Sequence, residues 1–363
     1  SDVYKRQVSN NAATVTNGGL VSAENVVVYE NNAFNLNRDG TLEINGSFFD
    51  AGQEGFNWND GGQLKITGSL EGISDLDGQD KTLVLDGGQW DTGTNNLWLG
   101  ETGSGSMLVV SNGAVAASSA TVLVGSTYVT SFDNTIVVGE GGTLSASNLI
   151  VQGANNALDL NEGGTLRMTG DFDVSDPLAQ FNWNGGGNLT VGGALSGLDE
   201  GLTNTAQILT LDGGSWDLGS NTLFVGTTGS SNQVVVKNGG SISNAAAFVG
   251  ESDFAIGNEV AITDGSEWIT AGALTIGSAS NTGNRVSVSS GGTVEARTLD
   301  VLSGEQAFIL QDDGTLLLTG SNTILQTEVD WQDGGELVAQ GDLDGFTTIF
   351  GNRKTLTIDG GSY

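Results

Sequence analysis

The chain has 363 residues, of which 43 are Asp or Glu and only 11 are Lys or Arg, so its net charge is −32. So few cations cannot meet a run of phosphates, which excludes nucleic acid as an expected partner and disfavours an anionic membrane surface. The lack of Cys and His excludes disulfides, thiolate metal sites, imidazole bases and Ser-His-Asp triads. No apolar run is long enough for a transmembrane helix, so we expect no membrane insertion.

The two ends of the chain carry little information about the fold. The first segment, residues 1–7, resembles a translated sequencing adapter, and we exclude it from the fold. We expect residues 8–363 to form one continuous domain. The chain stops at Tyr363 inside an LTIDGGSY unit that elsewhere continues into another repeat. We therefore expect a piece of a longer protein, whose export signal and anchor lie outside it.

An apolar residue followed by a turn rich in Gly, Asn and Asp recurs along the whole chain, at spacings of 21 to 28 residues. A period in this range is typical of a solenoid, in which each repeat buries its apolar face only against its neighbours. We expect these apolar positions to stack directly on one another in about fifteen rungs. The positions are Val15, Leu36, Trp58, Leu85, Val110, Val138, Leu160, Trp183, Leu211, Val236, Ile262, Val288, Leu310, Trp331 and Ile358.

Each rung contains three short apolar segments separated by polar turns. In the rung that begins at Leu97 they lie at residues 97–99, 108–110 and 114–117, with apolar and polar residues alternating. This alternation predicts strands with one inward face, and no helical periodicity is present. The pattern predicts an all-β fold, a single parallel β-helix, which we expect to be right-handed like most parallel crossovers.

A longer repeat is superimposed on the rungs. The segment FNWNDGGQLKITGSL at residues 56–70 matches FNWNGGGNLTVGGAL at residues 181–195 at 9 of 15 positions. We place three copies at residues 31–154, 155–304 and 305–363, the last of them cut short. Such copies are how a solenoid of interchangeable rungs grows by duplication.

The tryptophans fall into classes according to their place in the rung. Three of them occupy the inward position that Val or Leu fills elsewhere, so we predict that they belong to the core: Trp58, Trp183 and Trp331. A second class follows a DGG turn or lies at a similar offset, and we interpret its members as packing residues beside turns: Trp90, Trp216, Trp268 and Tyr363.

A row of large apolar residues lies on the outward side of the strands that read LxVG. Outward apolar residues that stack from rung to rung could bind a glycan ring or a partner protein, or neighbouring turns could cover them. We predict that this row is the candidate binding site, and we expect no catalytic, cofactor-binding or metal site. The residues of the row are Trp98, Leu123, Ile150, Phe224 and Phe248.

Two pairs of aspartates five residues apart could supply the acid and nucleophile of a glycoside hydrolase. The pairs are Asp86 with Asp91 and Asp212 with Asp217, at equivalent places in two copies of the repeat. A catalytic site is usually built once, whereas a turn residue is copied with its rung. We therefore favour a turn role for both pairs.

A β-helical polysaccharide lyase would need a cation among several carboxylates. The Lys and Arg residues fall in different rungs at different offsets, so we expect no rung to combine a cation with several carboxylates of adjacent strands. The acidic segment with Asp171, Asp173 and Asp176 could hold calcium, although a solvated loop is the simpler interpretation.

Two stretches, residues 223–243 and 260–294, carry an LxVG strand, a VxVxxGG strand and a GSxW turn at residues 265–268. In these elements the chain resembles the repeats of bacterial autotransporter (type V secretion) passengers and of PEP-CTERM-associated surface proteins. The resemblance implies a right-handed parallel β-helix that is secreted or displayed at the bacterial outer membrane. It implies a structural or adhesive role without catalysis.

Two kinds of partner fit such a role: a glycan, or a surface protein of a host or neighbouring cell. A different function remains open, that of a β-helical carbohydrate-active enzyme or carbohydrate-binding region. Both ends of the solenoid would expose unpaired strands, so we also expect aggregation or end-to-end association of the isolated chain.

Overall fold

The computed structural model of the chain describes residues 11–51, 55–127, 130–302, 304, 307–325, 327–345 and 351–363. The adapter-like residues 1–7 lie outside the described residues. By its internal contacts the chain falls into two compact units, unit 1 (Ser1–Asn184) and unit 2 (Gly185–Tyr363). Together they contain about 14 turns of a parallel β-solenoid, which confirms the predicted all-β fold. Within the described residues, no helix is long and apolar enough to span a membrane.

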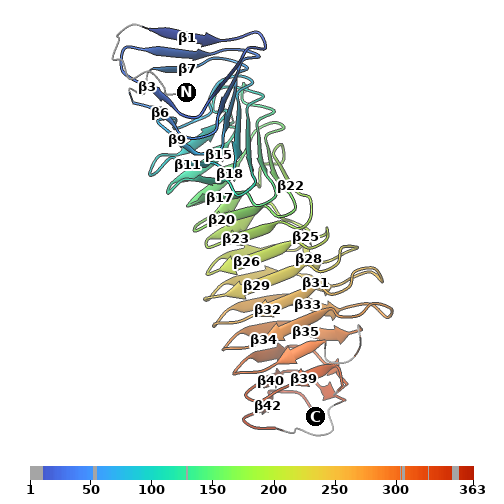
Figure 1. Cartoon of the computed structure of the whole chain (residues 1–363). Helices are drawn as coiled ribbons and strands as arrows, with labels where there is room; N and C mark the ends of the chain where they lie inside the picture. The colour runs from blue at the N-terminus through green and yellow to red at the C-terminus, as the bar shows by residue number, and fades with distance from the viewer. Residues whose placement is uncertain are drawn as a thin grey trace. The chain divides into compact units, whose positions relative to one another are not determined.

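Unit 1 is built from rows of short strands that pair in parallel with the turn before and the turn after (Figure 1). Its first row is a sheet of three strands, and its second row is a sheet of eight. The first row contains β1 (Ala12–Val15), β4 (Ala33–Leu36) and β7 (Phe56–Trp58). The second contains β2 (Leu20–Ala23), β5 (Thr41–Ile44), β8 (Gln63–Ile66), β10 (Thr82–Asp86), β13 (Met107–Ser111), β16 (Thr135–Val138), β19 (Ala157–Leu160) and β22 (Gln180–Trp183).

Two further rows complete the turns of unit 1. The third row contains β3 (Val26–Val28), β6 (Phe48–Asp50), β9 (Ser69–Glu71), β11 (Gln89–Asp91), β14 (Val115–Ala117), β17 (Thr143–Ala146) and β20 (Thr165–Met168). The fourth row contains β12 (Leu97–Leu99), β15 (Thr121–Val124), β18 (Asn148–Val151) and β21 (Phe172–Asp173).

Unit 2 has the same construction. Its first row contains β23 (Asn188–Val191), β26 (Ile208–Asp212), β29 (Gln233–Lys237), β32 (Glu259–Ile262), β34 (Arg285–Val288), β36 (Phe308–Leu310) and β39 (Val329–Trp331). Its second row contains β24 (Ala194–Ser196), β27 (Ser215–Asp217), β30 (Ser241–Asn244), β33 (Glu267–Ile276), β35 (Thr293–Val301), β37 (Thr315–Leu318), β40 (Glu336–Ala339) and β42 (Thr355–Ile358). Shorter rows contain β25 (Gly201–Leu202), β28 (Thr222–Val225) and β31 (Ala246–Val249), and β38 (Asn322–Thr323) with β41 (Leu343–Asp344).

The core of each unit is the inward row of apolar side chains, as the alternation predicts. In unit 2, Val236 pairs with Ile262 and Ile262 with Val288 in adjacent strands, and all three are fully buried. The residues between the inward positions are partly exposed, so each strand alternates between core and surface. Burying one such side chain contributes roughly 1.5–3 kcal/mol, and the stacking repeats that gain at every turn.

The apolar positions do not form one continuous stack, however. After each strand that ends in an inward tryptophan, the next apolar position in the series pairs with the strand that follows the tryptophan in the chain, and not with the tryptophan's own strand. Strand β7 is the last of its sheet, and β10 pairs with β8 instead. Strand β22 also ends its sheet, and β26 pairs with β23. Strand β39 ends a third sheet, and β42 pairs with β40. The expectation of a single stack is therefore wrong.

The inward positions instead form separate stacks, each of which ends on a tryptophan. We call the change of pairing partner that follows each of these tryptophans the pairing step. The stacks are Val15, Leu36 and Trp58; Leu85, Val110, Val138, Leu160 and Trp183; and Leu211, Val236, Ile262, Val288, Leu310 and Trp331.

Two of the tryptophans at the ends of stacks, Trp58 and Trp331, lie over the glycine turns that follow them. The indole Nε1 of Trp58 donates to the carbonyl oxygen of Gly62 at 3.0 Å, and that of Trp331 donates to Gly335 at 2.9 Å. A Cβ atom on Gly62 would lie 2.7 Å from Leu36 Cγ, so only glycine fits beneath the ring. Trp183 and Trp331 are buried, as predicted, and Trp58 is partly exposed.

Of the packing residues predicted beside turns, the tryptophans are buried deeply. Trp90, Trp216 and Trp268 are at most 2% exposed and are among the largest fully buried side chains. Trp268 Nε1 donates to Asn244 Oδ1 at 2.7 Å, so its polar edge is satisfied inside the core. Tyr363 differs from them, since 59% of its surface is exposed.

A ladder of buried asparagines links successive turns at the loops that follow the LxVG strands. In unit 2 the backbone N–H of Asn232 donates to Asn258 Oδ1 at 3.0 Å, and the backbone N–H of Asn258 donates to Asn284 Oδ1 at 2.9 Å. In unit 1 the N–H of Asn134 donates to Asn156 Oδ1 at 3.0 Å. Because buried polar groups need partners, each asparagine depends on the next turn for its hydrogen bonds.

The asparagine ladder explains the glycine of the LxVG pattern. Gly125 has a positive φ of 73°, and a Cβ atom on it would collide with the side-chain amide of Asn156. Any other residue would strain the backbone and displace the ladder.

Candidate functional site

The outward apolar residues predicted as a binding row lie on two separate sets of strands. In unit 1, Trp98 pairs with Leu123 and Leu123 with Ile150, on β12, β15 and β18. Leu123 is buried, with 8% exposure, whereas Trp98 and Ile150 are half-buried. The next position in register is Asp173, which ends the apolar run.

In unit 2 the row continues on different strands. Phe224 and Phe248 lie opposite each other on β28 and β31, and their rings stack with centroids 5.6 Å apart and planes 9° apart. The next positions in register are Thr275 and Asp300, which are polar. β28 pairs with β25 and β31, so these phenylalanines form a row of their own within unit 2. That the two rows bind a partner remains a prediction.

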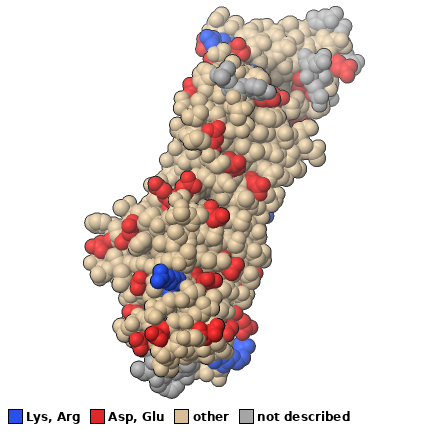
Figure 2. Space-filling model, turned by 180° about the vertical axis from the view of Figure 1, so that it is seen from behind, with Lys and Arg blue, Asp and Glu red and all other residues tan. Residues whose placement is uncertain are grey.

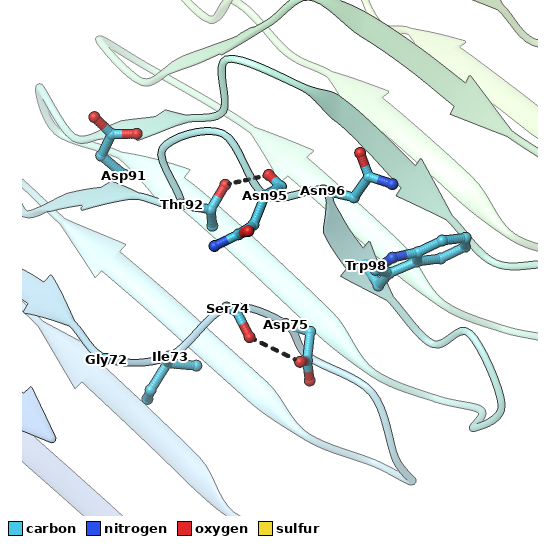
Figure 3. A pocket seen from close by; sticks show the side chains of 9 residues that line it. All are labelled: Gly72, Ile73, Ser74, Asp75, Asp91, Thr92, Asn95, Asn96 and Trp98. Carbon is cyan, nitrogen blue, oxygen red and sulfur yellow. Dashed lines mark hydrogen bonds between the residues drawn. The ribbon is translucent and has the colours of Figure 1, made fainter. Parts of the chain in front are cut away.

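A cleft of about 570 Å³ opens beside Trp98 in unit 1 (Figure 3). Two loops form its walls, one after β9 and one after β11, and Trp98 on β12 forms its apolar side. Its lining residues are Gly72, Ile73, Ser74, Asp75, Asp91, Thr92, Asn95, Asn96 and Trp98.

Hydrogen bonds hold both walls of the cleft, from the core in the first wall and within the loop in the second. The buried Trp90 donates its indole N–H to the carbonyl oxygen of Ile73 at 2.8 Å, which fixes the first wall. The N–H of Leu76 donates to the carbonyl oxygen of Trp98 at 2.8 Å, so the same segment runs along the edge of β12. In the second wall, the Thr92 hydroxyl donates to the carbonyl oxygen of Asn95 at 3.1 Å.

The polar groups of the cleft differ in where they point. Figure 3 shows the Asn95 amide on the side of its loop that faces Ser74 and Asp75, whereas the side chains of Asp91 and Asn96 turn away from that wall. The carboxylate of Asp75 accepts the Ser74 hydroxyl at 3.0 Å and the N–H of Asp77 at 3.3 Å. An aromatic ring, a carboxylate and an amide therefore border one space. The alternation in the sequence identifies Trp98 but neither Asp75 nor Asn95 as a site residue, since only the folded loops bring these residues together.

The two aspartate pairs considered as catalytic acids take part in hydrogen bonds between turns. Asp86 accepts the Asn112 amide at 2.6 Å and lies 3.1 Å from Lys65 Nζ, and these two contacts lower the pKa of Asp86. In the second copy Asp212 accepts the Asn238 amide at 2.5 Å and lies 3.3 Å from Lys237 Nζ. Both copies thus use the first aspartate to accept the asparagine amide of the next turn, whereas the lysine comes from the preceding strand in the first copy and from the following strand in the second.

The second aspartate of each pair closes the turn that follows it. Asp91 Oδ1 accepts the N–H of Gly93 at 2.8 Å, and Asp217 Oδ1 accepts the N–H of Gly219 at 2.9 Å. The Ser243 hydroxyl also donates to Asp217, at 2.6 Å, and this bond is the main reason that the pKa of Asp217 is lowered. A lowered pKa suits a permanent acceptor, not a general acid near neutral pH.

Two lysines do combine with several carboxylates, contrary to expectation. Lys65 lies between Glu43 and Asp86 of adjacent strands, with Nζ 3.6 and 3.1 Å from their carboxylates. Parallel stacking brings these residues together although they are far apart in the sequence. Lys81 is more enclosed, and its burial lowers its pKa although Asp75, Asp77 and Asp60 oppose the shift.

The surroundings of Lys81 recur around Lys354, in the third copy. Lys81 Nζ lies 5.9 Å from the centre of the Trp58 ring, and Lys354 Nζ lies 5.9 Å from that of Trp331. Lys354 also donates to the carbonyl oxygen of Trp331. Each of these two lysines thus covers the tryptophan at a pairing step, in the first and third copies of the repeat.

In the acidic segment considered for calcium, the carboxylates of Asp173 and Asp176 accept hydrogen bonds from backbone N–H groups. Asp176 accepts the N–H of Gly153 at 2.7 Å and that of Leu178 at 2.9 Å, and these bonds lower the pKa of Asp176. Asp173 accepts the N–H of Ser175 at 2.9 Å. Among the described residues, no group of three or more acidic side chains is arranged to hold a metal ion.

No protein-family model matches the chain, and a search of curated proteins found no match. Among solved structures the chain is similar to a fragment of TibA, in a crystal structure of that fragment hyper-glycosylated by TibC. The two chains are 15% identical, the match covers 95% of this chain and 98% of the TibA fragment, and the TM-score is 0.26. A similarity this distant assigns no function.

Proposed function

We propose that this chain is a structural and adhesive passenger region of a bacterial surface-exposed or secreted protein, without catalytic activity. The observation that carries the proposal is the equivalent use of acidic residues in successive copies of the repeat. Asp86 and Asp212 each accept the amide of an asparagine of the next turn, and Asp91 and Asp217 each close a glycine turn. Residues copied in this way serve the stacking of turns.

The distribution of charge supports the same role. Figure 2 shows carboxylates scattered over one face of the molecule, with Lys and Arg at only a few places. A spread of acidic groups keeps an extended surface soluble and repels other acidic surfaces, so adhesion would depend on local contacts. The half-buried Trp98 and the stacked Phe224 and Phe248 offer such contacts.

A carbohydrate-active enzyme is the second candidate, and the carboxylates around Lys81 are the observation that favours it. The internal copies argue against it. Lys81 and Asp60 recur as Lys354 and Asp333 beside the third tryptophan, and Asp333 accepts the N–H of Asn352 at 2.8 Å, as Asp60 accepts that of Gln79 at 3.4 Å. The middle copy has neither the lysine nor the aspartate at the corresponding sequence positions. The pair is therefore present at two of the three pairing steps, beside Trp58 and Trp331, where a lysine lies over a tryptophan ring.

The experiment compares adhesion with catalysis on the whole chain. Beads coated with the chain are incubated with bacterial and epithelial cells, beside beads coated with albumin and with the heat-unfolded chain. In parallel, the chain is incubated with pectin, alginate, xylan and chitin, and released reducing ends are measured. We expect retention that depends on the folded chain and no release. Release of reducing ends that stops in Lys81→Gln would overturn the proposal, as would equal retention of all three kinds of bead.

A further inference from the structure

We propose that the cleft beside Trp98 binds a neutral saccharide. The proposal gives a ligand class to the proposed adhesive function and rests on that function only for its biological use. It stands on three groups from three different segments of unit 1: the Trp98 ring, the Asp75 carboxylate and the Asn95 amide.

The position of Trp98 leaves its ring available to a ligand. Trp98 lies on β12, the first strand of its row, and on one side it is followed by Leu123 in register. On the other side lies the loop after β9, which touches β12 through a single bridge between Leu76 and Leu99. The half-buried ring therefore borders the cleft instead of packing beneath another strand. An exposed aromatic face packs well against the C–H face of a sugar ring.

Asp75 supplies the acceptor that sugar hydroxyls need. It precedes Leu76 as Trp98 precedes Leu99, so the bridge between Leu76 and Leu99 places the carboxylate beside the indole. Asp75 is exposed, and beyond its bonds to Ser74 and Asp77 its oxygens can still accept hydroxyl protons. Hydrogen bonds to an ionised carboxylate are about twice as strong as neutral ones.

Asn95 provides a donor and an acceptor on the opposite wall. Its amide faces the wall that carries Asp75, and among the described residues its side chain has no hydrogen-bond partner (Figure 3). A sugar carries adjacent hydroxyl groups that both donate and accept, which an amide and a carboxylate across a cleft can bind together.

The charge and the size of the cleft narrow the ligand class. Asp75 and Asp91 line the cleft and no Lys or Arg does, so sialylated, sulfated or uronic-acid glycans would be repelled. The volume of about 570 Å³ lies within the roughly 300–1,000 Å³ typical of small-molecule sites.

The second copy provides a matched control inside the same chain. Phe224 stands where Trp98 stands, but the residue opposite it in register is Gly201, which has no side chain to accept a hydroxyl. Leu218 replaces Thr92 at the corresponding position of the loop. An aromatic ring beside a carboxylate is thus present in the first copy and not at this place in the second.

The test is isothermal titration calorimetry of the whole chain with lactose, cellobiose, maltose, N,N′-diacetylchitobiose and 3′-sialyllactose. We expect at least one of the four neutral disaccharides to bind and sialyllactose not to bind. Trp98→Ala should raise the Kd about tenfold or more, and Asp75→Asn about threefold or more, whereas Phe224→Ala should change it by less than about twofold. Circular dichroism and thermal melting show whether each variant is folded.

Three results would overturn the proposal: no binding of any neutral disaccharide, binding of sialyllactose alone, or equal effects of Trp98→Ala and Phe224→Ala. Failure here leaves the proposed adhesive function standing if the coated beads still adhere. Binding of a disaccharide without adhesion would instead sustain the site and remove the adhesive function.

Discussion

At the scale of single residues, the glycines of this chain differ in what they make possible. Gly125 and Gly113 both have a positive φ, of 73° and 83°. A Cβ atom on Gly113 would meet nothing within 4 Å, whereas one on Gly125 would meet Asn156 and lie 2.5 Å from the carbonyl oxygen of Gln152. Gly113 is therefore needed only for its backbone conformation, whereas Gly125 also makes room for the buried asparagine ladder.

This difference gives a prediction for two alanine substitutions. Gly113→Ala should cost about 1 kcal/mol of unfolding free energy, from the left-handed backbone alone. Gly125→Ala should cost about 3 kcal/mol or more, because it also displaces Asn156 and its hydrogen bonds. Urea unfolding measures both. Equal losses would mean that the asparagine ladder does not depend on that glycine.

The lowered pKa of Asp217 gives a second prediction at this scale. The Ser243 hydroxyl and then the Gly219 N–H favour the ionised carboxylate, so its stabilising contribution is present above the usual pKa of about 3.8 and is lost as pH falls through the lowered value. Ser243→Ala should raise the pKa of Asp217 towards 3.8, as followed by NMR titration of the carboxyl carbon. The pKa of Asp86, held by Asn112 and Lys65, serves as the control and should not move. An unchanged Asp217 would show that the serine does not set its pKa.

At the scale of strands, the sequence predicted which residues face inward but not which strands pair. Alternation in VVVKNGG and VSVSSGG correctly placed Val236 and Val288 inward, since burial on one face leaves a period of two in any strand. The partner of a strand leaves no such trace, because every row shows the same alternation. Leu85 looks like the successor of Trp58, yet it pairs with Ile66.

A signal for the pairing step is visible in retrospect. Each inward tryptophan is followed by a long interval, from Trp58 to Leu85, Trp183 to Leu211 and Trp331 to Ile358. A long interval alone does not suffice, since Val110 and Val138 are equally far apart and pair directly. The combination of a bulky ring and an extra segment marks the step, because the ring closes one stack and the segment starts the next turn on another row.

The candidate site was predictable only in part, for a similar reason. Alternation identified Trp98 as an outward aromatic residue, which needs only its own strand. Asp75 and Asn95 lie in loops, and their distance from Trp98 depends on the bridge between Leu76 and Leu99 and on the bond from Trp90 to Ile73. These contacts follow from the pairing step, which the pattern of apolar residues does not encode.

At the scale of the whole molecule, the net charge of −32 means that carboxylates far outnumber the cations that could form ion pairs with them. The described residues contain five ion pairs, all between partly exposed side chains, and such pairs contribute little. Repulsion among the remaining carboxylates therefore dominates the electrostatic free energy of the folded chain.

Salt should accordingly stabilise the chain without specificity for the cation. Raising NaCl from about 10 mM to about 0.1 M shortens the screening length from roughly 30 to 10 Å and should raise the Tm. Calcium chloride at the same ionic strength should give the same rise, and a chelator should leave the Tm unchanged. A rise specific to calcium, reversed by the chelator, would show that the acidic loops hold metal ions after all.

The central claim, that parallel turns stack and change partner after each tryptophan, can be tested by cysteine cross-linking, since the chain has no cysteine of its own. Outward cysteines at Lys65 and Val84, which pair in register about 4.8 Å apart, should form a disulfide readily, and so should a pair at Val338 and Thr357. Cysteines at Asn57 and Val84, or at Asp330 and Thr357, should not. Efficient cross-linking of the second two pairs and not the first two would contradict the pairing step, and failure of all four would contradict the solenoid.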